Sequence, residues 1–211
     1  MGLPVLLLGE TGSGKTYSIK NFDPDEVGIF AVEKPYLPFK KEFKVAKNAD
    51  YDMIASTLLR KEDGKVQPKL KRYVIDDSQY LLVNELFDRV KETGYNKFTE
   101  MAVHFRNLIH NINKWVPDDV IVYFLHHPEV DATSGRYKAK TIGKMLDEKL
   151  TIEGCFNIVL FADVEGSEHH FITQSDGTIP AKSPEGLFEL KIPNDLKAVD
   201  NAIREYYGME D

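Results

Sequence analysis

The segment Gly9-Glu10-Thr11-Gly12-Ser13-Gly14-Lys15-Thr16 constrains this chain more than any other feature. It matches the phosphate-binding pattern G-x-x-x-x-G-K-[S/T] at every fixed position. Its glycines let the backbone approach phosphate oxygens, and its N–H groups point at the anion together with the N-terminus of the next helix. Lys15 supplies a positive charge for the β and γ phosphates, and the Thr16 hydroxyl is a ligand for Mg²⁺. We therefore predict a nucleotide site for ATP and Mg²⁺ that includes residues 9–16 and the adjoining Tyr17.

Short apolar runs alternate with helical patterns along the sequence. Strands are predicted from the apolar runs at residues 5–8, 27–32, 72–75 and 120–125. Shorter helices are expected at residues 16–21 and 52–59, and apolar residues at steps of three and four predict a long helix over 97–115. Such alternation is typical of an α/β fold with a mostly parallel central sheet between two helical layers.

The last third of the chain has a different pattern. Residues 157–162 and 169–173 predict an antiparallel strand pair joined by a turn at Gly166. A final helix is expected over residues 195–207, with Asn194 as its N-cap and Gly208 at its end. The predicted fold is therefore a three-layer α/β/α P-loop fold with a C-terminal antiparallel strand pair.

Polar side chains follow three of the predicted strands. Asp76 and Asp77 end the third strand, His126 and His127 end the fourth, and Glu33 ends the second. Since the carboxyl ends of parallel strands meet at one edge of a sheet, these residues are expected near the phosphate loop. Asp76 is the predicted Mg²⁺ partner of Thr16. Asp77 is left open as a water-orienting group, a hydrogen-bond partner beside Asp76 or a helix cap.

Composition and length narrow the class of protein. The 211 residues, 42% apolar and 29% charged, suit a single domain over 1–211 and exclude an intrinsically disordered chain. The one cysteine, Cys155, favours a reducing compartment, so a cytoplasmic location is expected. No apolar run has the length of a membrane span, and we expect no membrane partner. We predict a C-terminal helical tail over 184–211.

Charge is unevenly distributed along the chain. The net charge of −7 argues against broad binding to nucleic acid, yet the segment 129–149 has a cation-rich part, residues 133–149, with five cations against two carboxylates. We predict that this segment is a mobile basic loop that contacts single-stranded DNA, with an aromatic ring available for stacking on a base. The candidate DNA-binding residues are Arg136, Tyr137, Lys138, Lys140 and Lys144.

Four features together resemble the RecA-type recombinase core: the phosphate loop, Glu33, the run Val74-Ile75-Asp76-Asp77-Ser78, and the run Tyr123-Phe124-Leu125-His126-His127. The compact form is similar to phage-encoded single-strand annealing ATPases of the Sak type and their AAA-like relatives. The resemblance implies a RecA-like fold, weak DNA-stimulated ATP hydrolysis in phage-type homologous recombination, and a bacterial host cytoplasm as location.

The resemblance also assigns roles to residues and partners. Glu33 would be the catalytic carboxylate, and His127 or His126 would be the γ-phosphate sensor. Lys182 would reach the ATP of a neighbouring copy, which implies self-association with ATP at the subunit interfaces. The expected partners are single-stranded DNA and a single-stranded DNA binding protein. A ring and a transient assembly both stay open.

Two other functions are compatible with the same motifs. An ATP-gated loader or adaptor would grip a protein partner and ignore DNA. A small-molecule phosphotransferase fits less well, because such enzymes close an arginine-rich lid over the phosphates and the six arginines here are scattered. A GTPase is excluded, because neither Asn-Lys pair continues as Asn-Lys-x-Asp.

Overall fold

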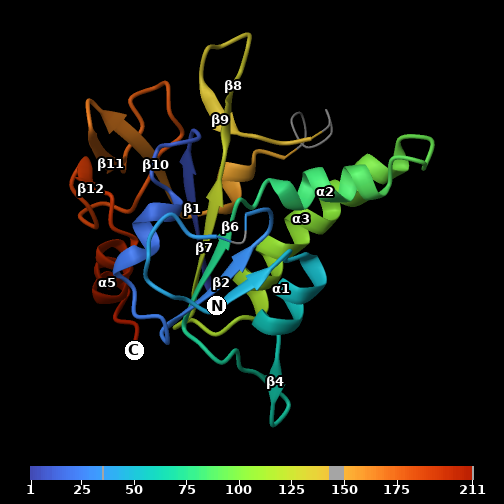
Figure 1. Ribbon diagram of the computed structural model, residues 1–211, viewed down its shortest axis with the longest axis horizontal. Helices are drawn as coiled ribbons and strands as arrows, with labels where there is room; N and C mark the ends of the chain where they lie inside the picture. Colours follow the sequence, from blue (N-terminus) through green and yellow to red (C-terminus); the bar gives the residue numbers. More distant parts are fainter. Residues whose placement is uncertain (35, 143–149, 211) are drawn as a thin grey trace.

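The computed structural model of the chain describes residues 1–34, 36–142 and 150–210. Its centre is an eight-stranded sheet with the strand order β12-β11-β10-β1-β7-β6-β2-β3 (Figure 1). The strands are β1 (Leu3–Gly9), β2 (Val27–Ala31), β3 (Val45–Lys47), β6 (Arg72–Asp76), β7 (Ile121–His126), β10 (Ile158–Glu165), β11 (Glu168–Ile172) and β12 (Lys191–Pro193). The four strands predicted before residue 130 are confirmed as β1, β2, β6 and β7.

The sheet is parallel from β10 to β3 and antiparallel beyond β10. The strand β1 pairs in parallel with β7 on one side and with β10 on the other. The strand β11 runs antiparallel to both β10 and β12, which confirms the predicted strand pair and adds a third strand to it. Mostly parallel order with an antiparallel C-terminal part is therefore confirmed.

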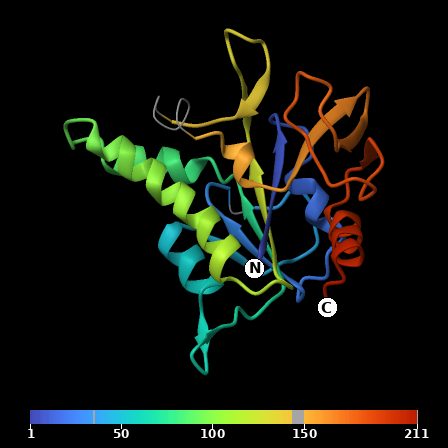
Figure 2. The ribbon, with the colours of Figure 1, turned by 180° about the vertical axis from the view of Figure 1, so that it is seen from behind.

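Helices cover both faces of the sheet, as Figures 1 and 2 show from opposite sides. One face carries α1 (Tyr51–Leu58), α2 (Tyr80–Asp88) and α3 (Asn96–Trp115), and the other carries the 3-10 helix η1 (Thr16–Asn21) and α5 (Leu196–Tyr207). The long helix predicted over 97–115 is confirmed as α3. Among the helices of the described residues, none is both long and apolar enough to cross a bilayer.

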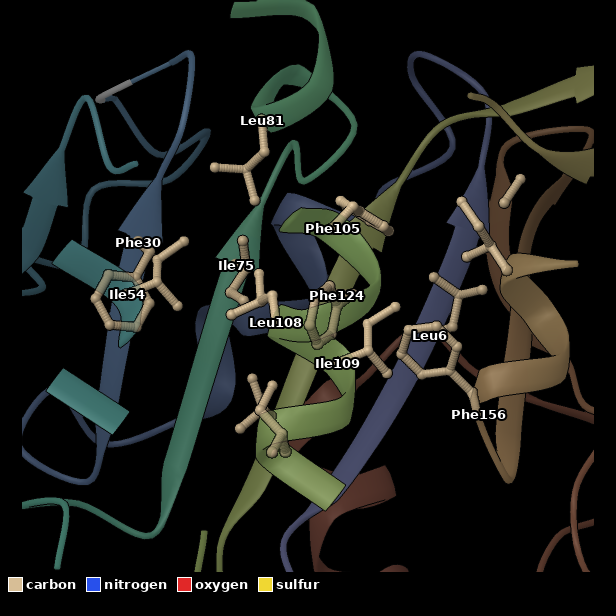
Figure 3. Close-up of a cluster of buried hydrophobic side chains, with 14 of the residues drawn as sticks. Leu6, Phe30, Ile54, Ile75, Leu81, Phe105, Leu108, Ile109, Phe124 and Phe156 are labelled. Atoms are coloured by element: carbon tan, nitrogen blue, oxygen red, sulfur yellow. The ribbon is translucent and has the colours of Figure 1, made fainter. Parts of the chain in front are cut away.

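Alternation along the central strands builds two cores. Leu6, Ile75 and Phe124 face α3, where Figure 3 shows them packed beside Leu108 and Ile109. The intervening residues of the same strands face η1 and α5 on the other side. Because both faces are buried, these strands read as continuous apolar runs, and that made them recognisable in the sequence.

Two small hairpins lie at opposite ends of the molecule in Figure 1. The first is β4 (Lys61–Glu62) with β5 (Lys65–Val66), and the second is β8 (Pro128–Val130) with β9 (Tyr137–Ala139). The second holds the described part of the segment predicted as a basic loop, and a short 3-10 helix, η2 (Ile152–Cys155), follows later in the chain. In the β8–β9 hairpin, Asp131 shapes the turn by accepting hydrogen bonds from the N–H groups of Thr133 and Ser134.

The prediction of Asn194 as the cap of the last helix is wrong. The cap of α5 is Asp195, whose side chain accepts hydrogen bonds from the N–H groups of Lys197 and Ala198. An aspartate is as good a cap as an asparagine, so the sequence alone did not separate the two neighbours. Gly208 ends the helix with φ +63°, as predicted. The segment 184–210 therefore supplies β12 to the sheet and α5 to a covering layer.

Candidate phosphate-binding site

The predicted phosphate loop, residues 9–16, begins at the last residue of β1 and depends on its glycines. Gly14 has φ +89°, and a Cβ there would lie 2.9 Å from both Asn194 Nδ2 and His169 Nδ1. At Gly9 a Cβ would lie 2.4 Å from Ser13 Oγ and 2.9 Å from the Cβ of Ala162 on β10. Larger residues would push the loop away from its neighbours, so the tight curve of the backbone needs glycine at both positions.

Lys15 is buried inside this loop, with 6% of its surface exposed. Its Nζ donates to the carbonyl oxygens of Gly9 at 2.6 Å and Glu10 at 3.0 Å. Burial lowers the pKa of Lys15 to about 8, although the nearby Asp77 and Asp76 raise it. The ammonium group is thus held by neutral carbonyl oxygens where an anion would be a better partner.

Thr16 and Asp76 are brought together by the ends of β1 and β6. The Thr16 hydroxyl lies 2.9 Å from Asp76 Oδ1 and 3.1 Å from Oδ2. Asp76 is 3% exposed. Burial and the charge of Asp77 raise the pKa of Asp76 to about 6, against the opposing effects of the Thr16 hydrogen bond and of Lys15. A hydroxyl beside a buried carboxylate suits a hard divalent cation.

Asp77 lies between two side chains that come from neighbouring strands. Its Oδ1 is 3.3 Å from His127 Nε2, and its Oδ2 is 3.5 Å from Lys34 Nζ. Burial alone would raise the pKa of Asp77, but the hydrogen bond with His127 and the charge of Lys34 hold it below its usual value. Its backbone has φ +60°, a conformation that costs energy for a residue with a side chain and that clusters at functional sites.

The two histidines at the end of β7, His126 within the strand and His127 just after it, have different surroundings. His126 is fully buried, with Nε2 2.8 Å from the carbonyl oxygen of Lys140 and Nδ1 2.9 Å from Ser78 Oγ. Burial lowers its pKa to about 4, so the ring is neutral and its Nε2–H donates to that carbonyl. Only His127 reaches the polar site, where it faces Asp77.

Two predicted catalytic residues lie apart from the phosphate loop. Glu33 is exposed and lines a cavity of about 660 Å³ that α1, α2 and α3 border. The backbone of Lys182 bridges to Val159, whose partner on β1 is Leu6. That position precedes the strand end at Gly9, so Lys182 is not at the loop of its own chain. Among the described residues, neither side chain makes a hydrogen bond or ion pair with Lys15, Asp76 or Asp77.

The candidate DNA-binding residues lie on the β8–β9 hairpin, apart from Lys144, which is outside the described residues. Arg136 and Lys140 are exposed, whereas Lys138 pairs with Glu129 at 3.2 Å. The Tyr137 ring packs on Phe161 with centroids 5.1 Å apart. Its hydroxyl donates to Glu10 Oε1 of the phosphate loop at 3.3 Å. The hairpin therefore contacts the loop that is predicted to bind phosphate.

Three residues near the loop were not singled out for this site by the sequence. Lys34 reaches Asp77, and both His169 Nδ1 and Asn194 Nδ2 approach the carbonyl oxygen of Ser13, at 3.1 and 3.4 Å. The position of His169 could have been inferred from the predicted antiparallel pair, because the start of its second strand, β11, lies beside the end of its first strand, β10. The signal for Asn194 required β12, which was not predicted.

The residues present fit a nucleotide with Mg²⁺. Ser13 Oγ is a buried loop atom without a hydrogen-bond partner among the described residues, and the buried Lys15 ammonium donates to the carbonyl oxygen of Gly9 in the same loop. The described residues hold no cluster of three or more His, Cys, Asp or Glu side chains suited to a metal. A magnesium ion here would take Thr16 and Asp76 as its protein ligands and its other ligands from phosphate and water.

Comparison with known proteins adds no family to these observations. No protein-family model matches the chain, and no curated protein matches it in sequence.

Proposed function

We propose that this chain is an ATP-binding and ATP-hydrolysing protein with a RecA-like fold, which binds and anneals single-stranded DNA. The observation that carries the proposal is the contact of Thr16 with Asp76 beside the buried ammonium of Lys15. It joins the two halves of a magnesium–triphosphate site from segments far apart in the sequence. The sheet order supports it, because the ends of β1, β7 and β6 lie side by side.

Each residue has a distinct part in binding. Lys15 exchanges the carbonyl oxygens of Gly9 and Glu10 for phosphate oxygens, which removes the cost of burying its charge. Thr16 and Asp76 hold Mg²⁺, which neutralises charge on the phosphates. The loop N–H groups bind the remaining oxygens.

Hydrolysis needs a group that orients water. Asp77 is ionised, and His127 fixes its carboxylate, so it is suited to accept a hydrogen bond from the attacking water. Glu33, two residues after the end of β2, is the second candidate. Single-turnover hydrolysis by Asp77→Asn and Glu33→Gln separates the two, because only the variant that lacks the water-orienting carboxylate loses turnover while it still binds ATP.

The β8–β9 hairpin provides the proposed DNA contact. Arg136 and Lys140 present exposed cations to a phosphate backbone. The hydrogen bond between Tyr137 and Glu10 joins the hairpin to the phosphate loop, so nucleotide binding and DNA binding would influence each other. Stacking of Tyr137 on a base would require that it leave Glu10 and Phe161.

A second function is favoured by the same hairpin. Tyr137 and Lys138 are already engaged within the chain, and the net charge is −7. Both facts favour an ATP-gated module that captures a protein partner through the hairpin. It would be indifferent to DNA.

The test is ATP turnover with and without a single-stranded oligonucleotide. We expect stimulation in the wild type, loss of turnover in Lys15→Ala, and loss of stimulation alone in a variant with Arg136→Ala and Lys140→Ala. The double variant should also reduce the salt dependence of DNA binding by the equivalent of about two phosphate contacts. The matched control is Lys61→Ala with Lys65→Ala, which removes two exposed lysines from the distant β4–β5 hairpin. Turnover without stimulation or salt-sensitive DNA binding would favour the protein-binding module.

A further inference from the structure

Lys34 reaches the polar site from the β2 side of the sheet. Its side chain is 64% exposed, yet its Nζ lies 3.5 Å from Asp77 Oδ2, and the Asp77 side chain is only 8% exposed. The backbone before it is fixed, because Val32 N–H donates to the carbonyl oxygen of Asp76 at 3.2 Å. The base of this long, largely exposed side chain is thus anchored to the end of β6.

The strand order places this cation opposite Lys15. In the sheet, β1 leads to Lys15, β6 carries Asp76 and Asp77, and β2 leads to Lys34. The two ammonium groups therefore approach the carboxylates from different strands.

We propose that Lys34 recognises the terminal phosphate and makes the site prefer a nucleoside triphosphate over a diphosphate. This rests on the proposed function of the site. Lys34 pairs with Asp77 when no triphosphate is bound, and its ammonium moves to the γ-phosphate oxygens when one is. Lys15 serves both nucleotides, because its ammonium is inside the loop that holds the β-phosphate.

The geometry makes this exchange favourable. The contact between Lys34 and Asp77 is long and largely exposed on the lysine side, and such pairs are weak. A terminal phosphate carries more charge than a carboxylate and offers more acceptor oxygens. When Lys34 leaves, Asp77 keeps its hydrogen bond with His127, so its charge is not left without a partner.

A purely structural role for Lys34 makes a different prediction. If the lysine only balanced the charge of Asp77, its removal would change the stability of the fold and weaken both nucleotides equally. The ratio of the two affinities therefore distinguishes recognition of the γ-phosphate from support of Asp77.

The experiment measures dissociation constants for ADP and for a non-hydrolysable ATP analogue, both with Mg²⁺, by calorimetry. Lys34→Gln should weaken the triphosphate about 10-fold, equivalent to one lost charged contact, and change ADP binding by less than about 2-fold. Lys34→Arg should keep most of the preference. Lys44→Gln is the matched control, since it removes an exposed lysine that also pairs with an aspartate, Asp25 at 2.9 Å.

The outcomes separate the two proposals. An unchanged ratio in Lys34→Gln, or an equal loss for both nucleotides, overturns the role of Lys34 and leaves the nucleotide site intact. If the wild type binds neither nucleotide, the site itself fails, and the role of Lys34 fails with it. Loss of both nucleotides in Lys15→Ala would show that binding occurs at the loop.

Discussion

Among the described residues, the buried charges around Asp200 and those around Asp76 are paired in different ways. Asp200 is fully buried between the sheet and α5. It accepts hydrogen bonds from Arg72 Nε at 2.6 Å, Arg204 Nε at 3.0 Å and the Tyr123 hydroxyl at 2.9 Å. Arg204 also donates to the carbonyl oxygens of Lys71 and Asp119. This cluster is closed: Asp200, Arg72 and Arg204 are all hydrogen-bonded to one another or to other groups of the chain.

The cluster around Asp76 is open by comparison. Lys15 is bonded only to carbonyl oxygens, and among the described residues Asp76 has a hydroxyl but no ion-pair partner within 4.0 Å. The pKa values of both are displaced toward the neutral form, to about 8 and about 6. The comparison teaches that a fully paired buried cluster holds the fold, whereas an incompletely paired one is suited to a charged ligand.

The largest effect is expected from opening the closed cluster. Asp200→Asn leaves Arg72 and Arg204 buried without their carboxylate, so the free energy of unfolding should fall by about 3–5 kcal/mol. Chemical denaturation measures it. Asp25→Asn, which removes the carboxylate of an exposed pair, should leave the midpoint unchanged. Equal stability of Asp200→Asn and the wild type would mean that the cluster does not hold α5.

Replacing Lys15, the lysine of the open cluster, with a neutral residue should raise the free energy of unfolding instead of lowering it. Since the pKa of Lys15 is lowered to about 8, its burial in the charged form destabilises the fold below that pH. Lys15→Met should therefore raise the free energy of unfolding at pH 7 by about 2 kcal/mol while nucleotide binding is lost. The gain should shrink from pH 8 toward pH 10.5, where the wild-type lysine loses its proton in both states.

Denaturation of both proteins across that pH range provides the measurement. Lys61→Met, at an exposed position, is the control and should show no such gain. If Lys15→Met were less stable than the wild type, the charge of Lys15 would be well paired within the chain, as in the cluster around Asp200, and this prediction would be wrong.

A smaller effect is expected at Asp76. Its pKa is raised to about 6, so the folded state binds the proton more tightly than the unfolded chain, and stability falls as pH rises from 3.8 to 6. Asp76→Asn should remove this fall and add about 1 kcal/mol at pH 7, because Asp77 shares the titration. Denaturation from pH 4 to pH 8 measures the free energy of unfolding of the wild type and of Asp76→Asn. Parallel curves for the two proteins would contradict a raised pKa of Asp76.

Much of this architecture could be predicted from the sequence. The buried strands and α3 have strong apolar patterns, and the rule that parallel strands end at one edge brought Thr16 and Asp76 together. The sequence could not show whether Glu33 or Lys34 would reach Asp77. The strand β2 ends at Ala31, and the regular alternation of side chains between the two faces of the sheet ends with it. His169 and Asn194 reach the loop through the pairing of β11 with β10 and β12, which is set by distant segments of the chain.

The central place of β1 has a consequence for how the chain folds. Its partners β7 and β10 follow only after the segments of α1, α2 and α3, so both sides of β1 are closed by contacts of long sequence separation. Such contacts form slowly, and until then the apolar edge of β1 is open to other chains. The loop after β1 cannot take its final shape before Ala162 and Asn194 pack against it. During synthesis, residues 9–16 would therefore reach their final conformation late, although they are made early.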